Sequence, residues 1–275
     1  MNTPKTPEQI ELSKLQAKLT KRFHKACADY GLIADGDHIL VGLSGGKDSL
    51  ALVELLGRRA QIYVPRFRVT ALHVRVKERD YRTDLSYLEQ FCTEAKVPLM
   101  VRDVEIGENS YSPQDGLTAK RSFSASGLSG EAAHGNPCFL CSWYRRKTLF
   151  NVAQELGCNK IAFGHHRDDM IETMLMNLLF QGTFATMPPL LPLEKMPLSI
   201  IRPLCLIDEA DLIRYATLRG YERQPKLCPF EHVSSRAKVK ELLAEMRTLN
   251  PEANDSMSAA MSNIKFDYLP HLVER

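Results

Sequence analysis

The feature that most constrains this chain is an apolar segment that ends in a glycine turn and continues into a helix-forming segment. Residues 39–43 read Ile-Leu-Val-Gly-Leu, and residues 44–49 read Ser-Gly-Gly-Lys-Asp-Ser. The apolar run predicts a buried strand, and the segment 48–60 predicts a helix. Two glycines allow a sharp turn that exposes consecutive amide groups, and the helix N-terminus adds a partial positive charge. The pattern predicts an anion-binding loop between a strand and a helix.

The glycine loop departs from the commonest phosphate-binding pattern. That pattern requires Gly six residues before the Lys and Ser or Thr directly after it, where this chain has Val41 and Asp48. The sequence Ser-Gly-Gly-Lys-Asp-Ser resembles instead the PP-loop of the ATP pyrophosphatase superfamily. Those enzymes cleave ATP between the α- and β-phosphates and adenylate an oxygen atom of the second substrate. The resemblance implies a nucleotide-binding loop.

This resemblance also assigns roles to individual residues. We expect the amides and hydroxyls of the loop to hold pyrophosphate and Lys47 to add a point charge. Asp48 is expected to hold Mg²⁺ or to act as a polar catalytic group. The expected ATP-binding residues are Ser44, Gly45, Gly46, Lys47, Asp48, Ser49, His73, Gly164 and His165.

A second polar turn, Gly-His-His-Arg-Asp-Asp at 164–169, follows a predicted strand at 160–163. Ligands of open α/β sheets bind at the carboxyl ends of strands. Asp168 and Asp169 are therefore catalytic candidates that hold Mg²⁺ or transfer protons. Capping of a helix at 170–181 is the alternative explanation for this pair. The two histidines of the turn line the nucleotide pocket or serve a structural role, and the sequence leaves both open.

Predicted strands and helices alternate along most of the chain. We expect strands at 38–43, 69–76, 99–104, 160–163 and 200–204, and helices at 9–30, 48–60, 84–95, 170–181 and 208–220. Such alternation predicts an α/β fold with a doubly wound parallel sheet, here with helical N- and C-terminal extensions.

Three segments depart from this alternation. The Gly- and Ser-rich segment 107–136 is expected to be a mobile lid or binding loop, and the Pro-rich segment 187–192 is expected to be a linker. Residues 234–263 are expected to be helical. The expected domains are a basic N-terminal helix at 1–30, a PP-loop domain at 31–222 and a C-terminal segment at 223–275.

The composition fits one large domain with small appendages, since 44% of the 275 residues are hydrophobic. No apolar run is long enough for a membrane span, and the N-terminus lacks the apolar core of a signal peptide, so we expect a cytoplasmic protein without membrane association. The net charge of +3 does not by itself indicate nucleic-acid binding. RNA contact and a solvated helix face both explain the local basic clusters. The RNA-binding candidates are Lys18, Arg22, Arg145 and Arg146.

Seven cysteines in a chain expected to be cytoplasmic favour metal or redox chemistry over disulfides. Cys138 and Cys141 form a lone C-x-x-C, which by itself fits a zinc half-site, a redox pair or part of an iron–sulfur site. Cys228 lies in a polar, proline-flanked segment. Three ligands suit a cluster with one open iron better than a closed zinc site. The other cysteines are expected in the core: Cys27, Cys92, Cys158 and Cys205.

The order of these motifs resembles the tRNA 2-thiocytidine synthetase family, the tRNA-cytidine(32) 2-sulfurtransferases, over about residues 20–245. The shared motifs are the loop at 44–49, the C-x-x-C before a basic helix, the turn at 164–169, Met187-Pro-Pro, Ile201-Arg-Pro-Leu204 and Leu227-Cys228. Membership implies a 4Fe-4S cluster held by Cys138, Cys141 and Cys228. It also implies ATP, Mg²⁺ and sulfur transfer to C2 of cytidine 32 in tRNA. One position departs from many relatives, because Pro225 stands where they have a further cysteine.

The resemblance further implies partners. These are tRNA and a sulfur donor, either a cysteine desulfurase system or free sulfide, and a homodimer through the terminal helices is considered as well. Two alternatives stay open from the residues alone. The first is another PP-loop enzyme that acts on RNA, such as a 2-thiouridine synthetase or a lysidine-type ligase. The second is a non-catalytic tRNA-binding metalloprotein.

Overall fold

The structure, a computed structural model, describes residues 5–77, 83–105, 137–222 and 235–270, without the side chains of residues 137–140 and 235. The chain divides into two units. The first contains a sheet and most of the helices, and the second is formed by helices from the later part of the chain. No helix within the described ranges is long and apolar enough to cross a membrane.

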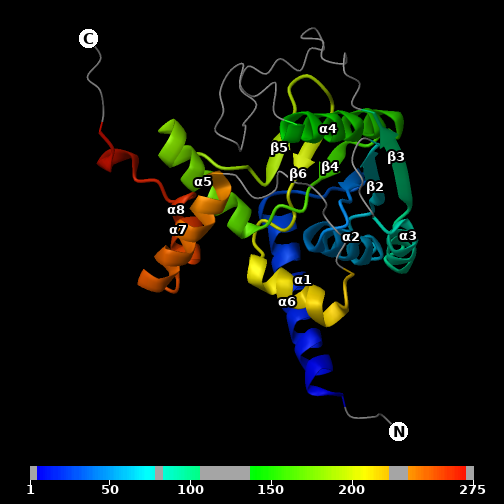
Figure 1. The fold of residues 1–275 in the computed structure, drawn as a ribbon, viewed down its shortest axis with the longest axis horizontal. Coiled ribbons are helices and arrows are strands. Elements are labelled where there is room, and N and C mark those ends of the chain that lie inside the picture. Colours follow the sequence, from blue (N-terminus) through cyan, green and yellow to red (C-terminus); the bar gives the residue numbers. More distant parts are fainter. Residues whose placement is uncertain (1–4, 78–82, 106–136, 223–234, 271–275) are drawn as a thin grey trace. The chain divides into compact units, whose positions relative to one another are not determined.

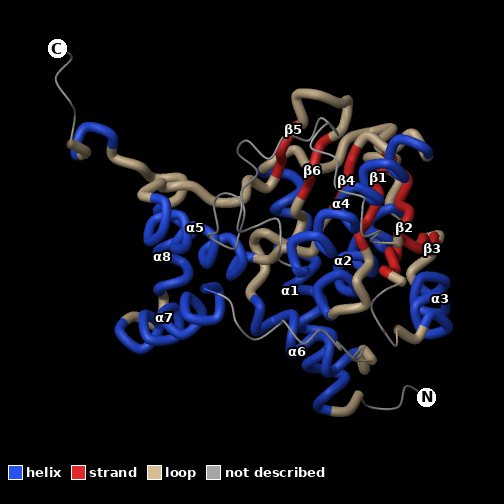
Figure 2. Tube along the Cα trace, turned by 45° about the horizontal axis from the view of Figure 1, so that its top comes forward, coloured by secondary structure: helices blue, strands red, loops and turns tan. Residues whose placement is uncertain are grey.

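The first unit is built on a six-stranded sheet, whose strands lie side by side in Figure 2. The strands are β1 (His38–Gly42), β2 (Arg68–Val76), β3 (Leu99–Val104), β4 (Lys160–Ala162), β5 (Leu190–Pro192) and β6 (Ser199–Ile201). Their order is β3-β2-β1-β4-β6-β5, and all pairs are parallel except that of β5 with β6. Strands β2 and β3 lie on one side of β1, and β4, β6 and β5 lie on the other. The carboxyl ends of β1 and β4 therefore border a topological switch point, where open α/β sheets bind ligands.

Helices cover both faces of the sheet. In the first unit they are α1 (Pro7–Asp29), α2 (Lys47–Ala60), α3 (Leu85–Glu94), α4 (Pro137–Glu155) and α6 (Glu209–Arg219). In Figure 1, α4 runs along one face of the sheet, and α2 and α3 lie on the other. This arrangement leaves the loop between β1 and α2 at the carboxyl edge of the sheet.

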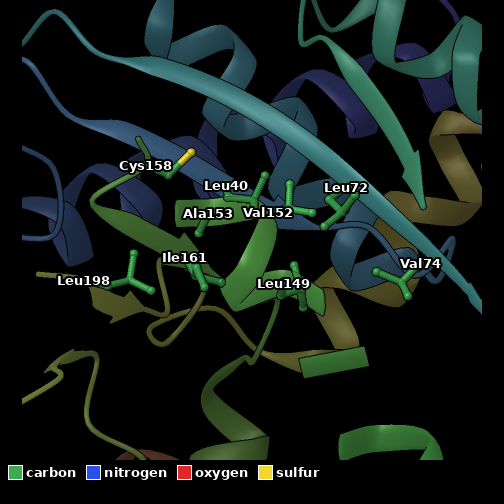
Figure 3. Packing of buried hydrophobic residues seen from close by; sticks show 9 residues of the cluster. All are labelled: Leu40, Leu72, Val74, Leu149, Val152, Ala153, Cys158, Ile161 and Leu198. Atoms are coloured by element: carbon green, nitrogen blue, oxygen red, sulfur yellow. The ribbon is translucent and has the colours of Figure 1, made fainter. Parts of the chain in front are cut away.

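The central strand β1 is buried on both faces of the sheet. One core cluster lies between the sheet and α4 and consists of Leu40, Leu72, Val74, Leu149, Val152, Ala153, Cys158, Ile161 and Leu198 (Figure 3). Because side chains alternate along a strand, Ile39 and Val41 point to the face opposite Leu40. Both are fully buried as well. A central parallel strand that is apolar on both sides is the expected result, and it fixes β1 in the middle of the fold.

Helix α6 runs beside α2 in the same direction. Near the start of both helices, Lys47 Nζ lies 3.3 Å from Glu209 Oε1, and further along, Tyr215 donates to Glu54 Oε1 at 3.1 Å. Glu54 is only 4% exposed, so its charge is costly to desolvate without partners. Four side chains pair with its carboxylate: Tyr215, Tyr221, Arg58 and Arg219. The network fixes α6 against α2, and both helices begin at the same end.

The second unit consists of α5 (Arg167–Gln181), counted from Asp168 on, α7 (Ser235–Leu249) and α8 (Ala253–Ala260), followed by a short turn at Phe266–Tyr268. Its small core is formed by Ile171, Met174, Leu175, Met176, Val239 and Leu243, with Met246, Met257 and Met261 packed against it. Flexible methionines fill such an irregular space well. Because this core is small, polar contacts between the helices matter for the stability of the unit.

The predicted doubly wound parallel sheet is confirmed, and two details differ. The segment 187–192, expected to be a linker, contains β5, which pairs at the sheet edge. An edge strand tolerates Pro192 because only one of its sides carries ladder hydrogen bonds. The C-x-x-C, expected before a helix, lies inside α4, which begins at Pro137. Proline is favourable at a first helical position because its missing N–H has no helical partner there.

The remaining sequence predictions have mixed outcomes. The helical stretch expected at 234–263 is divided into α7 and α8 at Pro251, a residue that disfavours continuation of a helix. The expected lid at 107–136 lies outside the described residues. The expected domain boundaries at residues 31 and 223 stay a prediction.

Gly57 offers a test of how α2 packs against the segment after α3. A Cβ atom built at Gly57 would lie 2.2 Å from the backbone oxygen of Ala95 and 3.0 Å from Val97 Cγ2. Ala is the better helix former by about 1 kcal/mol, but overpacking against backbone costs about 1–3 kcal/mol or more. We therefore expect Gly57→Ala to lower the free energy of unfolding by about 2 kcal/mol, measured by urea denaturation.

Gly42→Ala is the matched control, because its Cβ would meet Leu149 at an ordinary 3.5 Å. We expect it to change the unfolding free energy by less than about 1 kcal/mol. Equal stability of the two variants would contradict this description of the packing of α2.

Candidate functional site

The loop between β1 and α2 is shaped for close approach by an anion. β1 ends at Gly42 and α2 begins at Lys47, which leaves a turn of four residues at 43–46. Gly45 has φ +80°, in the left-handed region that glycine adopts without strain. Gly46 occupies the N-cap position and has no side chain to cap the helix. The first amide groups of α2 therefore face the turn, where the helix dipole favours a negative charge.

Ser44 and Ser49 hold the turn in shape. Their hydroxyl oxygens are 3.1 Å apart, and the Ser44 amide donates to Ser49 Oγ at 3.2 Å. Ser49 Oγ in turn donates to the Gly46 carbonyl at 2.9 Å. Ser49 is 6% exposed, so its hydroxyl mainly fixes the backbone, whereas Ser44 is exposed. The structure thus brings residues 44–49 together as one cradle, and their contacts with ATP stay a prediction.

Lys47 and Asp48 provide the charges of this cradle. Lys47 Nζ lies 3.1 Å from Asp48 Oδ2, and both side chains are somewhat more than a quarter exposed. The other carboxylate oxygen, Asp48 Oδ1, is buried and has no hydrogen-bond partner among the described residues. A carboxylate oxygen oriented into a polar loop is the type of ligand that Mg²⁺ prefers. Asp48 therefore fits the expected Mg²⁺ ligand, although its role in catalysis stays a prediction.

Gly164 brings the turn after β4 against the start of α2. A Cβ atom built there would lie 3.1 Å from the backbone carbon and oxygen of Asp48 and 3.2 Å from the amide nitrogen of Ser49. Only a glycine permits this approach without displacing the cradle. Gly164 thus contributes to the loop through its backbone. The two turns meet because β1 and β4 are neighbours in the sheet.

The histidines occupy different positions around the loop. His73, on β2, is 3% exposed and donates from Nδ1 to the Leu43 carbonyl at 2.8 Å, since a carbonyl only accepts. Burial lowers the pKa of His73, the hydrogen bond with Leu43 partly opposes this, and the charge of Arg145 adds to the lowering. A neutral His73 therefore fixes the backbone directly after β1 through its hydrogen bond with the Leu43 carbonyl. His165 stacks at a tilt on Phe163, with ring centroids 5.7 Å apart. ATP contacts of His73 and His165 stay a prediction.

Glu209 is a residue of this site that the sequence analysis missed. It lies in the first turn of α6, and its Oε1 atom is 3.3 Å from Lys47 Nζ and 3.9 Å from His166 Nε2. The preceding residue, Asp208, pairs with Arg167 and, at 3.3 Å, with Arg22. The Asp-Glu pair at the expected start of a helix was the available signal. Only the parallel placement of α6 and α2 brings it to the loop.

Most of the cysteines that were expected in the core are buried. Cys92, Cys158 and Cys205 are buried, which confirms the expectation of core positions, and Cys27 is partly buried. Burial raises the pKa of Cys27 and Cys205 to about 12 and that of Cys92 and Cys158 to about 11. Among the described residues, these four belong to no group of three or more possible metal-ligating side chains.

The expected cluster ligands are only partly described. Cys138 and Cys141 both lie in the first two turns of α4, and the Cys141 side chain is 9% exposed. The Cys138 side chain and all of Cys228 lie outside the described residues. Iron–sulfur clusters are held by thiolates, most often four of them, so three cysteines are chemically suitable ligands that leave one iron without a protein ligand. Their assembly stays a prediction.

The expected RNA-binding side chains have partners within the chain. Lys18 pairs with Asp211 at 2.6 Å, and Arg22 donates to the Leu206 carbonyl at 2.8 Å, so both tie α1 to α6 and the segment before it. Arg146 donates to the Ser142 carbonyl at 3.2 Å within α4. Arg145 lies close enough to His73 for its charge to act on that ring. RNA contact by these residues stays a prediction, and Lys18 and Arg22 have a structural role besides.

Asp168 and Asp169 belong to the second unit and are held by arginines. Asp168 is 4% exposed, and its Oδ1 accepts from Arg247 at 2.5 Å and from Asn254 at 3.0 Å. Asp169 accepts from Arg236 at 2.9 Å. The alternative explanation of helix capping is wrong, because α5 begins at Arg167 and both residues lie inside its first turn. Their expected catalytic role stays a prediction.

Known proteins resemble this chain along nearly its whole length. The PP-loop domain family matches residues 12–127. A tRNA-cytidine(32) 2-sulfurtransferase of Aliivibrio salmonicida is 35% identical over 261 residues, which cover 94% of this chain and 78% of that protein. One of Shewanella pealeana is 33% identical over 267 residues, which cover 96% and 79%. The solved U34-tRNA thiolase NcsA of Methanococcus maripaludis, with its 4Fe-4S cluster, has the same fold, with a TM-score of 0.66 at 23% identity over 92% of this chain and 81% of that one.

Gly164→Ala tests the cradle without changing a charge. We expect the added methyl group to displace the backbone of Asp48 and Ser49 and to weaken nucleotide binding roughly tenfold or more, since small misplacements at such sites are costly. Calorimetry with α,β-methylene ATP, which resists cleavage between these phosphates, measures the change. Gly42→Ala, with only ordinary contacts two residues before the loop, is the control. Unchanged affinity in Gly164→Ala would contradict the proposed contact of the two turns.

Proposed function

Because the chain belongs to the tRNA-cytidine(32) 2-sulfurtransferase family, we propose that it converts cytidine 32 of tRNA to 2-thiocytidine in an ATP-dependent reaction. The observation that carries this proposal is the cradle at 43–49. It joins a helix N-terminus, an ammonium group and the unpartnered Asp48 Oδ1 at the switch point of a doubly wound sheet. Such a site binds the polyphosphate of a nucleotide and leaves its α-phosphate accessible to a second substrate.

The reaction follows from the chemistry of cytosine. Its C2 carbonyl oxygen is a poor leaving group, so direct displacement by sulfur is slow. Attack of that oxygen on the α-phosphorus of ATP forms an O–P bond and releases pyrophosphate. A sulfur nucleophile then adds at C2, the C2–O bond breaks, and AMP leaves with the original oxygen. The cradle stabilises the charge that develops on the departing pyrophosphate.

Three carboxylates are proposed for the metal and proton chemistry. Asp48, in the first turn of α2 directly after the loop, holds Mg²⁺, because its Oδ1 atom has no hydrogen-bond partner among the described residues. Asp168 and Asp169 stay candidates for Mg²⁺ binding or proton transfer, and their arginine and asparagine partners would orient them for that role. Lys47 contributes charge to the phosphates, and His73 keeps the end of β1 in place.

The sulfur chemistry is proposed to depend on a 4Fe-4S cluster held by Cys138, Cys141 and Cys228. With three protein ligands, the cluster would leave one iron open to bind a sulfur nucleophile. Family membership favours this function over the two alternatives that the residues alone left open, because the relatives above are named for thiolation of cytidine.

Nucleoside analysis tests the proposed acceptor. We expect tRNA from a strain that lacks this gene to lose 2-thiocytidine, as measured by mass spectrometry, and a plasmid copy to restore it. Loss of a 2-thiouridine or of lysidine instead would identify another acceptor and contradict the proposal. Unchanged modification would contradict it as well, once a second thiolase is excluded.

Matched variants in the same complementation test separate the roles of the residues. Cys228→Ala should lose cluster absorbance and thiolation, whereas Cys27→Ala should keep both. Asp48→Ala should keep the cluster absorbance and lose turnover, since it removes only the proposed Mg²⁺ ligand. Full absorbance in Cys228→Ala would remove it from the ligand set.

We further propose that the reaction takes place in the cytoplasm, with free sulfide or a cysteine desulfurase system as sulfur donor, and that two copies of the chain associate. An apolar patch on the second unit supports association. It is formed by Leu178, Leu179, Phe180 and Phe184, which are 40–58% exposed. These exposed apolar side chains are close together in the sequence, and clusters of exposed apolar side chains mark interaction surfaces. The patch lies at the end of α5 and beyond it, not on the terminal helices that the sequence analysis considered.

Light scattering tests this association. The chain has a mass of 31.1 kDa, so a dimer scatters as about 62 kDa, twice that mass. We expect Leu179→Ser combined with Phe180→Ser to reduce the measured mass to that of the monomer. Ile213→Ser, which changes a 51% exposed residue of α6, is the control and should stay dimeric. A monomeric parent protein would contradict the proposal.

A further inference from the structure

The Lys47 ammonium is shared between two carboxylates that come from different helices. Asp48 is its neighbour in sequence, and Glu209 reaches it from α6 at 3.3 Å. The Glu209 side chain is 27% exposed and the Lys47 side chain 28%, so the pair is accessible to a solute. Glu209 also lies 3.9 Å from His166 Nε2, whose ring is 3% exposed. The Glu209 carboxylate therefore lies at the edge of the cradle, against the residue that adds its positive charge.

Glu209 is held in this place from both ends of its helix. At the start of α6, Asp208 pairs with Arg22 and Arg167. At the end, Tyr215 and Arg219 bind the buried Glu54 of α2. These contacts fix the backbone of Glu209 beside the loop, so an entering anion displaces only its side chain from Lys47. The negative charge of Glu209 also lies close to the N-terminus of α6, where the helix dipole stabilises it.

Two anions then compete for one ammonium. A pyrophosphate in the cradle needs Lys47, because the ammonium group is the positively charged side chain of the loop. Glu209 offers the same type of ligand, oxygen atoms with a negative charge, and repels pyrophosphate at short range. Lys47 can bind Glu209 fully only when it releases the phosphate oxygens.

We propose that Glu209 is a positioning residue that competes with pyrophosphate for Lys47 and thereby promotes release of this product. This inference rests on the proposed function, since it assigns pyrophosphate to the cradle. ATP and pyrophosphate both have to displace Glu209. Pyrophosphate, unlike ATP, has to leave the cradle in every turnover. A contact that weakens anion binding therefore shortens the time for which pyrophosphate occupies the cradle, and turnover becomes faster. The cost is weaker nucleotide binding, which contacts to the rest of ATP offset.

Glu209→Gln tests the inference, because glutamine has nearly the same shape without the charge. We expect it to bind inorganic pyrophosphate about tenfold more tightly than the parent protein, as measured by calorimetry without added divalent cations. Inhibition of turnover by pyrophosphate should become stronger by the same factor. kcat should fall while the KM for ATP falls with it, because ground-state binding improves and release slows.

Asp211→Asn is the matched control. It removes one negative charge from the same turn of α6, but its partner is Lys18 and not Lys47. We expect it to change pyrophosphate affinity less than twofold, and thermal melting of both variants shows that they are folded. Equal or weaker pyrophosphate binding by Glu209→Gln overturns the inference, as does equal tightening in both variants. If the parent protein binds no pyrophosphate at all, the proposed function of the cradle fails and the inference fails with it.

Discussion

The site depends on one constraint, which is that the backbone of Gly164 lies against the first turn of α2. An added Cβ would lie 3.1 Å from the Asp48 backbone, closer than an ordinary contact, so a side chain here would displace the start of α2 by a few tenths of an ångström. The contact exists because β1 and β4 are neighbours in the sheet, so that the turns after both strands emerge together. The amides of the cradle are thereby placed by two strands of the buried sheet, not by a loop alone. A site on such a support is held rigidly, as phosphate transfer requires.

The charges around the cradle are balanced by a second helix. Since α6 runs parallel to α2, two helix N-termini with their partial positive charges lie at the same end. Asp208 and Glu209 offset part of this positive field, and Lys47 restores it. The buried Glu54 network maintains the parallel arrangement far from the loop. Anion affinity at the cradle therefore depends on residues more than a hundred and fifty positions apart in the sequence, brought together by helix packing.

Local patterns were sufficient for much of this description. The apolar run into Ser-Gly-Gly predicted the strand, the turn and the helix, because glycine and periodicity act within a few residues. Three of the four cysteines assigned to the core, Cys92, Cys158 and Cys205, are buried there. Glu209 was missed because the acidic pair at 208–209 indicates only a helix start, while its contact with Lys47 joins residues in different segments. The edge strand β5 was missed because Pro-rich sequence usually opposes strand formation, and only the pairing with β6 compensates.

Asp168 has a structural role in addition to its proposed catalytic role. Its carboxylate is almost fully buried and accepts from both Arg247 and Asn254, and Arg247 also donates to Asn254 at 3.1 Å. Removing Asp168 takes away the counter-charge of Arg247, whose side chain is 40% exposed, and the acceptor of the Asn254 side-chain amide. The second unit has a small methionine-rich core, so such a loss weighs heavily on it. Lost activity in an Asp168 variant therefore has two physical causes, and only a companion change at Arg247 separates them, because it removes the ion pair while leaving the carboxylate in place.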